Sequence, residues 1–210
     1  MIFLDKVLKM IRAIVFDYGG VVGANVMQFI YERMARKAKL PIEEVKTEYY
    51  KFKQAIQKGE MSMSMFYLRL GKNLNIDPNE LEEIWITTIN EKVGTNKDVV
   101  EIVRLLKNGG YKIALCTNNM MPFVELHNKR GDFNIFPIKI ISCEIGMRKP
   151  DKEIYEYALK QLNVKAEECI FIDNKFENME AAKNVGMNGI LFKDARQLRE
   201  ELRKCGVHGL

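Results

Sequence analysis

Five short apolar segments, separated by helical patterns, constrain the fold of this chain more than any other feature. They span residues 12–16, 112–116, 138–142, 169–172 and 189–192, and each is rich in Ile, Val or Phe. From residue 112 onwards they alternate with amphipathic helical patterns, and parallel strands need crossover connections of this kind. The sequence therefore predicts an α/β fold with a mostly parallel sheet covered by helices on both faces.

A helical insertion interrupts this alternation after the first apolar segment. Four helical patterns follow one another at residues 26–39, 42–58, 64–73 and 78–90, with no strand pattern among them. The last pattern opens with Asp77-Pro78-Asn79-Glu80, a capping box with Pro at the first helical position. We expect residues 23–92 to form an inserted helical cap, and residues 1–22 and 93–210 to form the core domain.

Composition excludes several classes of protein. The 210 residues are 47% hydrophobic and 29% charged, which fits globular domains rather than disordered or fibrous chains. The net charge of +5 comes with no nucleic-acid-binding motif, and no apolar run approaches the ~20 residues that a bilayer requires, so we expect neither nucleic acid nor membrane as a partner. Four widely spaced cysteines without a CxxC pair favour a reduced, cytoplasmic protein. The sequence indicates no oligomeric state, and we hypothesise that Met10 is an alternative start.

Polar residues stand where three of the predicted strands end. These are Asp17, Thr117 and Asp173, and ligands bind at the carboxyl ends of the strands in open parallel sheets. One such residue alone is typical of a turn. The three together, with Lys149 in the loop after the third strand, predict an anion site. Thr117 and Asn118 also precede a helical pattern, whose N-terminus is able to hold phosphate.

The order of these residues resembles a known family. Asp17-Tyr18-Gly19-Gly20-Val21, Thr117-Asn118, Lys149-Pro150 and Asp173-Asn174 resemble, in sequence, the four motifs of the haloacid dehalogenase superfamily. The insertion resembles its C1 cap, and residues 145–150 resemble its sugar-phosphatase-like branch, related to epoxide hydrolase N-terminal domains. The resemblance implies a Rossmann-like core.

It also implies a function, which is Mg²⁺-dependent hydrolysis of a small phosphomonoester through an aspartyl-phosphate intermediate. Sugar phosphates and nucleotides are the expected substrates. Asp17 is then the nucleophile, Thr117 and Asn118 hold phosphate oxygens, and Lys149 stabilises charge on the reacting groups. By the same resemblance, Mg²⁺ is held by Asp17, the backbone carbonyl of Gly19, and the fourth motif with Asp173 and Asn174.

Two departures from the family pattern keep alternatives open. Gly19 stands where many phosphatases of the superfamily carry an acid, and general acid–base catalysis is worth ~10²–10⁴-fold. A catalytically impaired phosphate-binding or regulatory protein is therefore one alternative. Asn174 stands where a metal ligand is often Asp and adds no negative charge. A metal-independent 2-haloacid dehalogenase is the other alternative, although Asp173 would repel Asp17 without a cation.

Other features favour structural roles. Residues 32–58 carry eight Lys or Arg against four Glu, which is typical of a solvated helix face. The alternative is a basic face that steers a phosphorylated substrate to Asp17. Most of the aromatic residues 49, 50, 52 and 85 are expected in the cap core, and a stacking surface for a base or sugar is the alternative. His127 and His208 are expected in surface or capping positions.

Overall fold

The computed structural model describes residues 10–210, so the hypothesis about the first nine residues lies outside the described chain. The chain forms a five-stranded, wholly parallel sheet with the strand order β3-β2-β1-β4-β5. The strands are β1 (Ala13–Phe16), β2 (Lys112–Thr117), β3 (Ile138–Ile141), β4 (Cys169–Asp173) and β5 (Asn188–Leu191). The predicted α/β fold is confirmed. β2 and β4 each extend one residue beyond the prediction, so that Thr117 and Asp173 are the last residues of their strands.

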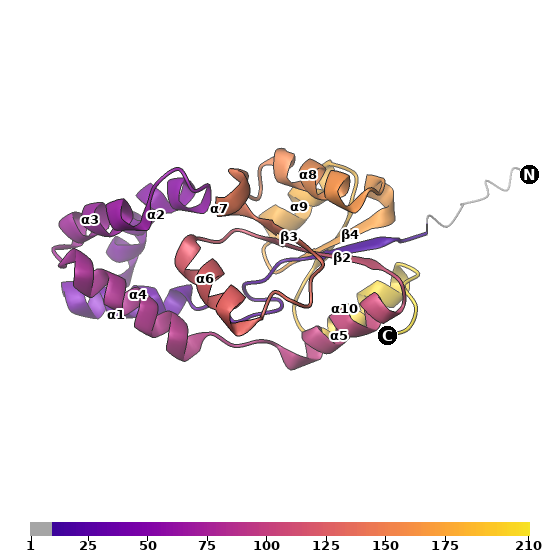
Figure 1. Cartoon of the computed structure of the whole chain (residues 1–210), viewed down its shortest axis with the longest axis horizontal. Helices are drawn as coiled ribbons and strands as arrows, with labels where there is room; N and C mark the ends of the chain where they lie inside the picture. Colours follow the sequence, from indigo (N-terminus) through magenta and orange to yellow (C-terminus); the bar gives the residue numbers. More distant parts are fainter. Residues whose placement is uncertain (1–9) are drawn as a thin grey trace, which may run out of the picture.

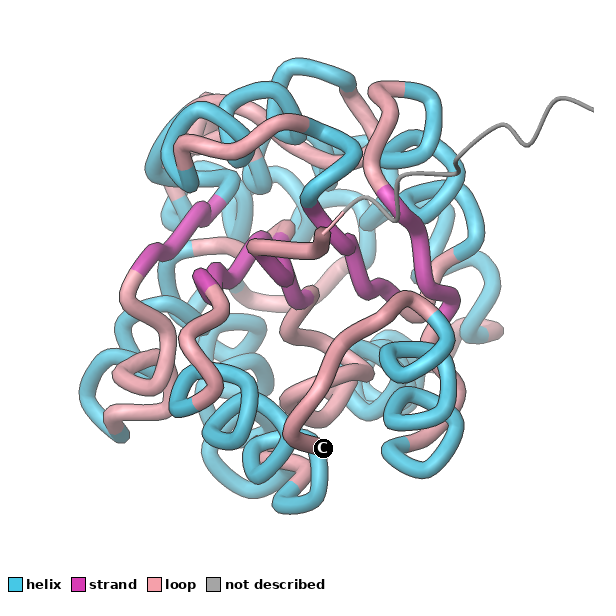
Figure 2. The backbone as a smooth tube through the Cα atoms, turned by 90° about the vertical axis from the view of Figure 1, so that its right-hand side faces the viewer, coloured by secondary structure: helices cyan, strands magenta, loops and turns pink. Residues whose placement is uncertain are grey.

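Helices cover both faces of the sheet (Figures 1 and 2). One face packs on α5 (Lys97–Asn108) and α10 (Ala195–Lys204). The other packs on α8 (Lys152–Leu162) and α9 (Phe176–Asn184), with the short helix η1 (Ala166–Glu168) preceding β4. This layering explains why the central strands β1, β2 and β4 are almost wholly apolar, since both faces of the sheet are covered there, whereas the edge strand β3 carries the exposed Lys139.

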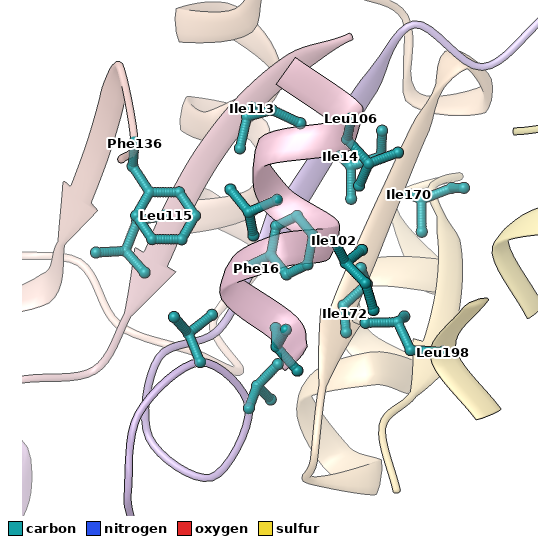
Figure 3. Packing of buried hydrophobic residues seen from close by; sticks show 14 of the residues in the cluster. Ile14, Phe16, Ile102, Leu106, Ile113, Leu115, Phe136, Ile170, Ile172 and Leu198 are labelled. Carbon is teal, nitrogen blue, oxygen red and sulfur yellow. The ribbon is translucent and has the colours of Figure 1, made fainter. Parts of the chain in front are cut away.

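Successive side chains of β1 point to opposite faces of the sheet, so alternate residues pack against the two helical layers. Ile14 and Phe16 pack on the side of α5, where Ile102 lies among them (Figure 3). Ala13 and Val15 pack on the side of α8.

Four helices form a separate layer, the cap, beyond the carboxyl ends of the strands (Figure 1). They are α1 (Met27–Ala38), α2 (Ile42–Gln57), α3 (Met63–Leu74) and α4 (Pro78–Lys92). Their core surrounds Trp85, which packs against Tyr49 and Phe66, all three fully buried. Asp77 caps α4 by accepting hydrogen bonds from the N–H groups of Asn79 and Glu80. The structure thus has the helical insertion expected from the sequence, and the exact domain boundaries stay predictions.

Two chain segments join the cap to the core and pair with each other. The N–H of Ala24 donates to the carbonyl of Gly94 at 2.9 Å, and the N–H of Asn96 donates to the carbonyl of Val22 at 2.8 Å. Within residues 10–210, no helix is long and apolar enough to cross a membrane.

A second contact between cap and core lies at the end of α2. Gly59 has a positive φ of 70° and faces the backbone carbonyl of Cys143 in α7 (Ser142–Ile145). Nearby, the Lys58 ammonium lies 3.1 Å from a carboxylate oxygen of Asp151. Helix α7 was not predicted: Ser142, expected at the end of the third strand, instead begins this single turn.

Candidate active site

Strand register brings the predicted polar residues to one edge of the sheet. Phe16 in the central strand pairs with Leu115 on one side and Ile172 on the other. Asp17 and Asp173 therefore follow at the same level, and Thr117 lies one position further along the sheet at the end of β2. Asp17, Thr117 and Asp173 converge at this edge because the strands are parallel and adjacent.

Lys149 joins two of these residues. Its ammonium lies 2.8 Å from Oδ1 of Asp17 and 2.7 Å from Oδ2 of Asp173. The lysine side chain is 1% exposed, and the two carboxylates are 9% and 0% exposed. A buried charge of this kind is stable only when it is paired, and here one cation is shared between two anions. The cluster therefore carries a net charge of about −1 when all three groups are ionised, which favours a further cation.

The pKa values of the pair follow from this arrangement. Burial raises the pKa of the Asp17 carboxyl above its usual value, while the Lys149 ammonium opposes this effect and Asp173 adds to it. Burial alone would lower the pKa of Lys149, but the two carboxylates outweigh burial and hold the pKa above its usual value. Lys149 is therefore a permanently charged group at the base of the site.

Both carboxylate oxygens of Asp173 also accept hydrogen bonds from residues that follow it in the chain. Oδ2 also accepts from Nδ2 of Asn178 at 2.9 Å, and Oδ1 accepts from the backbone N–H of Lys175 at 2.8 Å. Tyr155 in turn donates its hydroxyl to the carbonyl of Asn178 at 2.9 Å. Asp173 is thus a fixed, buried carboxylate whose main partner is the Lys149 ammonium.

Thr117 and Asn118 lie where β2 ends, but their side chains differ in availability. In the described part of the chain, no group hydrogen-bonds the Thr117 hydroxyl, and the residue lines a cavity. The Asn118 side chain is engaged instead, because its Oδ1 accepts from the N–H of Lys149 and its Nδ2 donates to the Lys149 carbonyl. Asn118 therefore positions Lys149 through its side chain, and its backbone N–H remains for an anion.

Asn174 presents an unpaired oxygen beside the first loop. Its Oδ1 is buried and has no hydrogen-bond partner among the described residues, and its side-chain amide lies against Gly20, where any Cβ would collide with it. Gly20 has a φ of 88°, which glycine adopts readily. No backbone hydrogen bond in residues 10–210 ends on the Gly19 carbonyl. Carboxylate, amide and carbonyl oxygens of this kind are the ligands that Mg²⁺ prefers, so the donor set fits that ion.

Among the described residues, the candidate oxygen ligands at this site include only two carboxylate side chains. Residues 10–210 contain no cluster of three or more His, Cys, Asp or Glu side chains arranged to hold a metal. Asp17 and Asp173 are the two carboxylates here, and the other available oxygens belong to an amide and to the backbone. This composition excludes a typical zinc centre of Cys and His at the site.

A cavity of about 340 Å³ lies over Asp17, between core and cap. Its base includes Asp17, Thr117 and Lys149, and its roof comes from α1 and α2. Pockets of ~300–1,000 Å³ are typical of small-molecule sites. The site is thus shaped for a small ligand that reaches the Asp17 carboxylate under the cap.

Comparison with known proteins identifies the family. The family model for "haloacid dehalogenase-like hydrolase" matches residues 11–186. The chain belongs to this family. A sesquiterpene phosphatase of Aspergillus oryzae is 31% identical over 155 residues, which cover 72% of this chain and 77% of that protein. A D-ribitol-5-phosphate phosphatase of Bacteroides thetaiotaomicron is 26% identical over 92% of this chain and 97% of the relative.

Solved structures agree on the fold. A haloacid dehalogenase family enzyme from Bacteroides thetaiotaomicron, crystallised with magnesium and inorganic phosphate, superimposes with a TM-score of 0.70 at 16% identity. The match covers 90% of this chain and 98% of the other. The family resemblance predicted from the four motifs is confirmed, and this chain is a haloacid dehalogenase-like hydrolase with phosphatases among its relatives.

Several residues of this hydrolase's site carried no signal in the sequence. Ser142 accepts from the backbone N–H of Asn119 at 2.9 Å and donates to the Asn119 carbonyl at 3.2 Å, which fixes the loop after β2. Asn178 and Tyr155 support Asp173 from α9 and α8. From the cap, Tyr50 and Lys53 line the cavity, and Tyr50 is 54% exposed rather than buried in the cap core. Only the aromatic residues and the general excess of basic residues in that region pointed to them.

Of the surface or capping positions expected for His127, the surface position is wrong. The residue is 2% exposed, and its Nδ1 lies 2.9 Å from a carboxylate oxygen of Asp132. Its ring packs edge-on against Tyr18, with centroids 4.4 Å apart. The helical position near the end of α6 (Met121–Arg130) gave no sign of this burial, because it results from packing against the loop after β1.

Proposed function

We propose that this haloacid dehalogenase-like hydrolase is a Mg²⁺-dependent phosphatase that hydrolyses a small phosphomonoester through an aspartyl-phosphate at Asp17. The observation that carries the proposal is Lys149, buried and shared between Asp17 and Asp173 beneath the cavity. A carboxylate nucleophile attacks a phosphate anion only when positive charge surrounds both, and this lysine supplies part of that charge.

In the first step, a carboxylate oxygen of Asp17 bonds to phosphorus while the ester bond to the leaving group breaks. The leaving alkoxide takes a proton from solvent, because Gly19 offers no acid. In the second step, water attacks the phosphorus of the aspartyl-phosphate, inorganic phosphate leaves, and the Asp17 carboxylate is restored. Throughout, Lys149 stays protonated, and the Thr117 hydroxyl and backbone N–H groups after β2 hold phosphate oxygens.

For the metal, we propose Asp17, the Gly19 carbonyl and Asn174 Oδ1 as protein ligands. The bound ion would neutralise charge on the carboxylate and on the phosphate. Asp173 fits a positioning role better than a ligand role, because Lys149, Asn178 and the Lys175 N–H already engage its oxygens. The unpaired oxygen of Asn174 supports its assignment as the ligand from the fourth motif.

The experiment measures phosphate release from p-nitrophenyl phosphate and from a panel of sugar and nucleotide phosphates, with Mg²⁺ or with EDTA. The wild type is compared with Asp17→Asn, which keeps the shape of the side chain, and with Asp98→Asn on α5 as a control. We expect metal-dependent turnover that Asp17→Asn abolishes and Asp98→Asn retains.

Two other results would favour the two alternative functions. Phosphate binding without turnover on the whole panel would favour an impaired phosphate-binding protein, for which the missing side chain at Gly19 is the relevant observation. Halide release from 2-haloacids with no need for metal would favour a dehalogenase. The pairing of Asp17 and Asp173 around one lysine supports the phosphatase, since the net negative charge favours a metal cation.

A further inference from the structure

One face of α2 forms the roof of the cavity. Lys46, Tyr50, Lys53 and Gln57 line it, and their spacing of three to four residues places them in a row along the helix. Of the eight basic residues between positions 32 and 58, Lys46 and Lys53 are the two that line this cavity. Six of these basic residues thus lie away from the cavity, and the ammonium groups of the other two lie above the site.

These two lysines differ in how their charge is balanced. The Lys46 ammonium pairs with Glu43 at 2.8 Å. Lys53 forms no salt bridge with any residue between 10 and 210, and its ammonium instead lies 4.7 Å from the centroid of the Tyr50 ring. A ring fixes the position of an ammonium but does not neutralise it. Lys53 is therefore a half-buried cation held in place without a carboxylate partner.

Further positive charges surround Lys53. Lys175, in the loop after β4, lines the same cavity and has no salt-bridge partner in the described chain. Arg148 forms none there either, and its guanidinium hydrogen-bonds Oε1 of Gln57 at 3.4 Å. Burial lowers the pKa of Lys53, and repulsion from Lys175 and Arg148 lowers it further, while attraction by Glu177 offsets part of this effect. Like charges gathered at one end of a cavity are stabilised when an anion binds between them.

We propose that Lys53 and Lys175 form a subsite for a second anionic group of the substrate, a carboxylate or phosphate at the end remote from the scissile phosphate. This inference rests on the proposed phosphatase function. The scissile phosphate belongs beside Asp17 and Lys149 in the core, whereas Lys53 projects from the cap. A cavity of about 340 Å³ leaves room for a short spacer between the two anions.

The first test uses matched substrate pairs. The ω-phosphooxy carboxylates with one to four methylene groups are compared with the ω-hydroxyalkyl phosphates of the same length, which lack the second charge. We expect kcat/KM for the carboxylate member to exceed that of its partner by about tenfold at one preferred length, the effect of one charge-assisted hydrogen bond. Equal kcat/KM within every pair would overturn the proposal.

The second test uses Lys53→Met with Lys51→Met as a matched control. Lys51 lies on the same helix but is exposed and pairs with Glu48. We define the preference as kcat/KM for the carboxylate member of a pair divided by kcat/KM for its hydroxyalkyl partner. We expect Lys53→Met to reduce this ratio to about one, and Lys51→Met to retain the wild-type ratio. If Lys53→Met lowered kcat/KM equally for both members of a pair, Lys53 would serve the scissile phosphate and the subsite proposal would be wrong.

A binding measurement separates failure of this proposal from failure of the proposed function. Calorimetric titration with phosphonocarboxylates that match the four spacer lengths, such as 3-phosphonopropionate, and with alkylphosphonates of the same chain length, such as propylphosphonate, needs no turnover, because the carbon–phosphorus bond is not hydrolysed. We expect the phosphonocarboxylate of the preferred length to bind about tenfold more tightly than its partner to the wild type and to Lys51→Met, but not to Lys53→Met. Equal affinity within every pair for the wild type would overturn the subsite even if the enzyme is a phosphatase.

Discussion

Asn118 and Lys149 exchange two hydrogen bonds across the site. The N–H of Lys149 donates to Oδ1 of Asn118 at 2.8 Å, and Nδ2 of Asn118 donates to the Lys149 carbonyl at 2.7 Å. The side chain at the end of β2 thereby fixes the backbone of a residue 31 positions away. Because that backbone carries the ammonium shared by Asp17 and Asp173, this pair of bonds sets the geometry of the charged cluster.

Asn118→Ala is therefore expected to act on catalysis through Lys149. Loss of both bonds leaves the Lys149 backbone groups unsatisfied in a partly buried position, which costs about 1–3 kcal/mol of stability. We expect kcat to fall by about tenfold with a smaller change in KM, because the ammonium loses its fixed position. Steady-state kinetics and urea unfolding measure the two effects. Asn134→Ala, at an exposed loop position, is the control, and an unchanged kcat for Asn118→Ala would contradict the positioning role.

The strands and the site edge were predictable because their signals are local. An apolar run of four or five residues followed by a polar residue marks both a buried strand and its carboxyl end, and parallel pairing then brings those ends together. Asp17, Thr117 and Asp173 were found in this way. Lys149 was added from its place in the loop after the third predicted strand, although its burial between two carboxylates is a property of the folded chain.

The supporting residues could not be predicted, because their roles arise from long-range packing. Ser142 reaches the backbone of Asn119, 23 residues away, and nothing in its own neighbourhood indicates that partner. Likewise, the face of α2 that roofs the cavity depends on how Gly59 docks against α7. Sequence periodicity locates the buried face of that helix, but it does not distinguish Lys53 over the cavity from Lys51 in solvent.

Gly19→Asp is expected to increase activity rather than reduce it. A Cβ at Gly19 meets no atom within 4 Å, and the backbone there does not adopt a positive φ, so the loop accepts a side chain. The new carboxyl group would act as the missing acid, a contribution worth about 10²-fold or more where the leaving group is poor. We expect the gain in kcat to be large for alkyl phosphates and small for p-nitrophenyl phosphate.

The matched control for this prediction is Gly19→Asn, which has the same shape but transfers no proton. An equal gain from Asn and Asp would attribute the effect to binding instead of proton transfer. No gain for alkyl phosphates with Gly19→Asp, in a variant that unfolds at the wild-type temperature, would contradict the role assigned to this position.

Gly59→Ala is expected to disturb the closure of the cap. An added Cβ would collide with the backbone carbonyl of Cys143, so the end of α2 would have to move away from α7. Because α2 carries the roof of the cavity, we expect KM to rise several-fold. Gly110→Ala is the control: its φ of 84° imposes a similar backbone strain of about 1–2 kcal/mol, but its Cβ meets nothing within 4 Å. Equal KM values for the two variants would show that the contact with α7 does not shape the site.

Asn174→Asp is expected to tighten Mg²⁺ activation. The unpaired Oδ1 of Asn174 is replaced by a carboxylate oxygen, which adds a negative charge to a site that already favours a cation. We expect the Mg²⁺ concentration for half-maximal activity to fall by about tenfold. Without metal, the variant is expected to be less stable than the wild type, because its new charge crowds those of Asp17 and Asp173.

Mg²⁺ should therefore raise the unfolding temperature of Asn174→Asp more than that of the wild type, a readout that needs no turnover. Asn79→Asp adds the same charge at an exposed position near the start of α4, on the cap surface, and should leave both measurements unchanged. If Asn174→Asp kept the wild-type response to Mg²⁺ in both measurements, Asn174 would be removed from the metal site, and its unpaired oxygen would need another partner, such as an ordered water molecule.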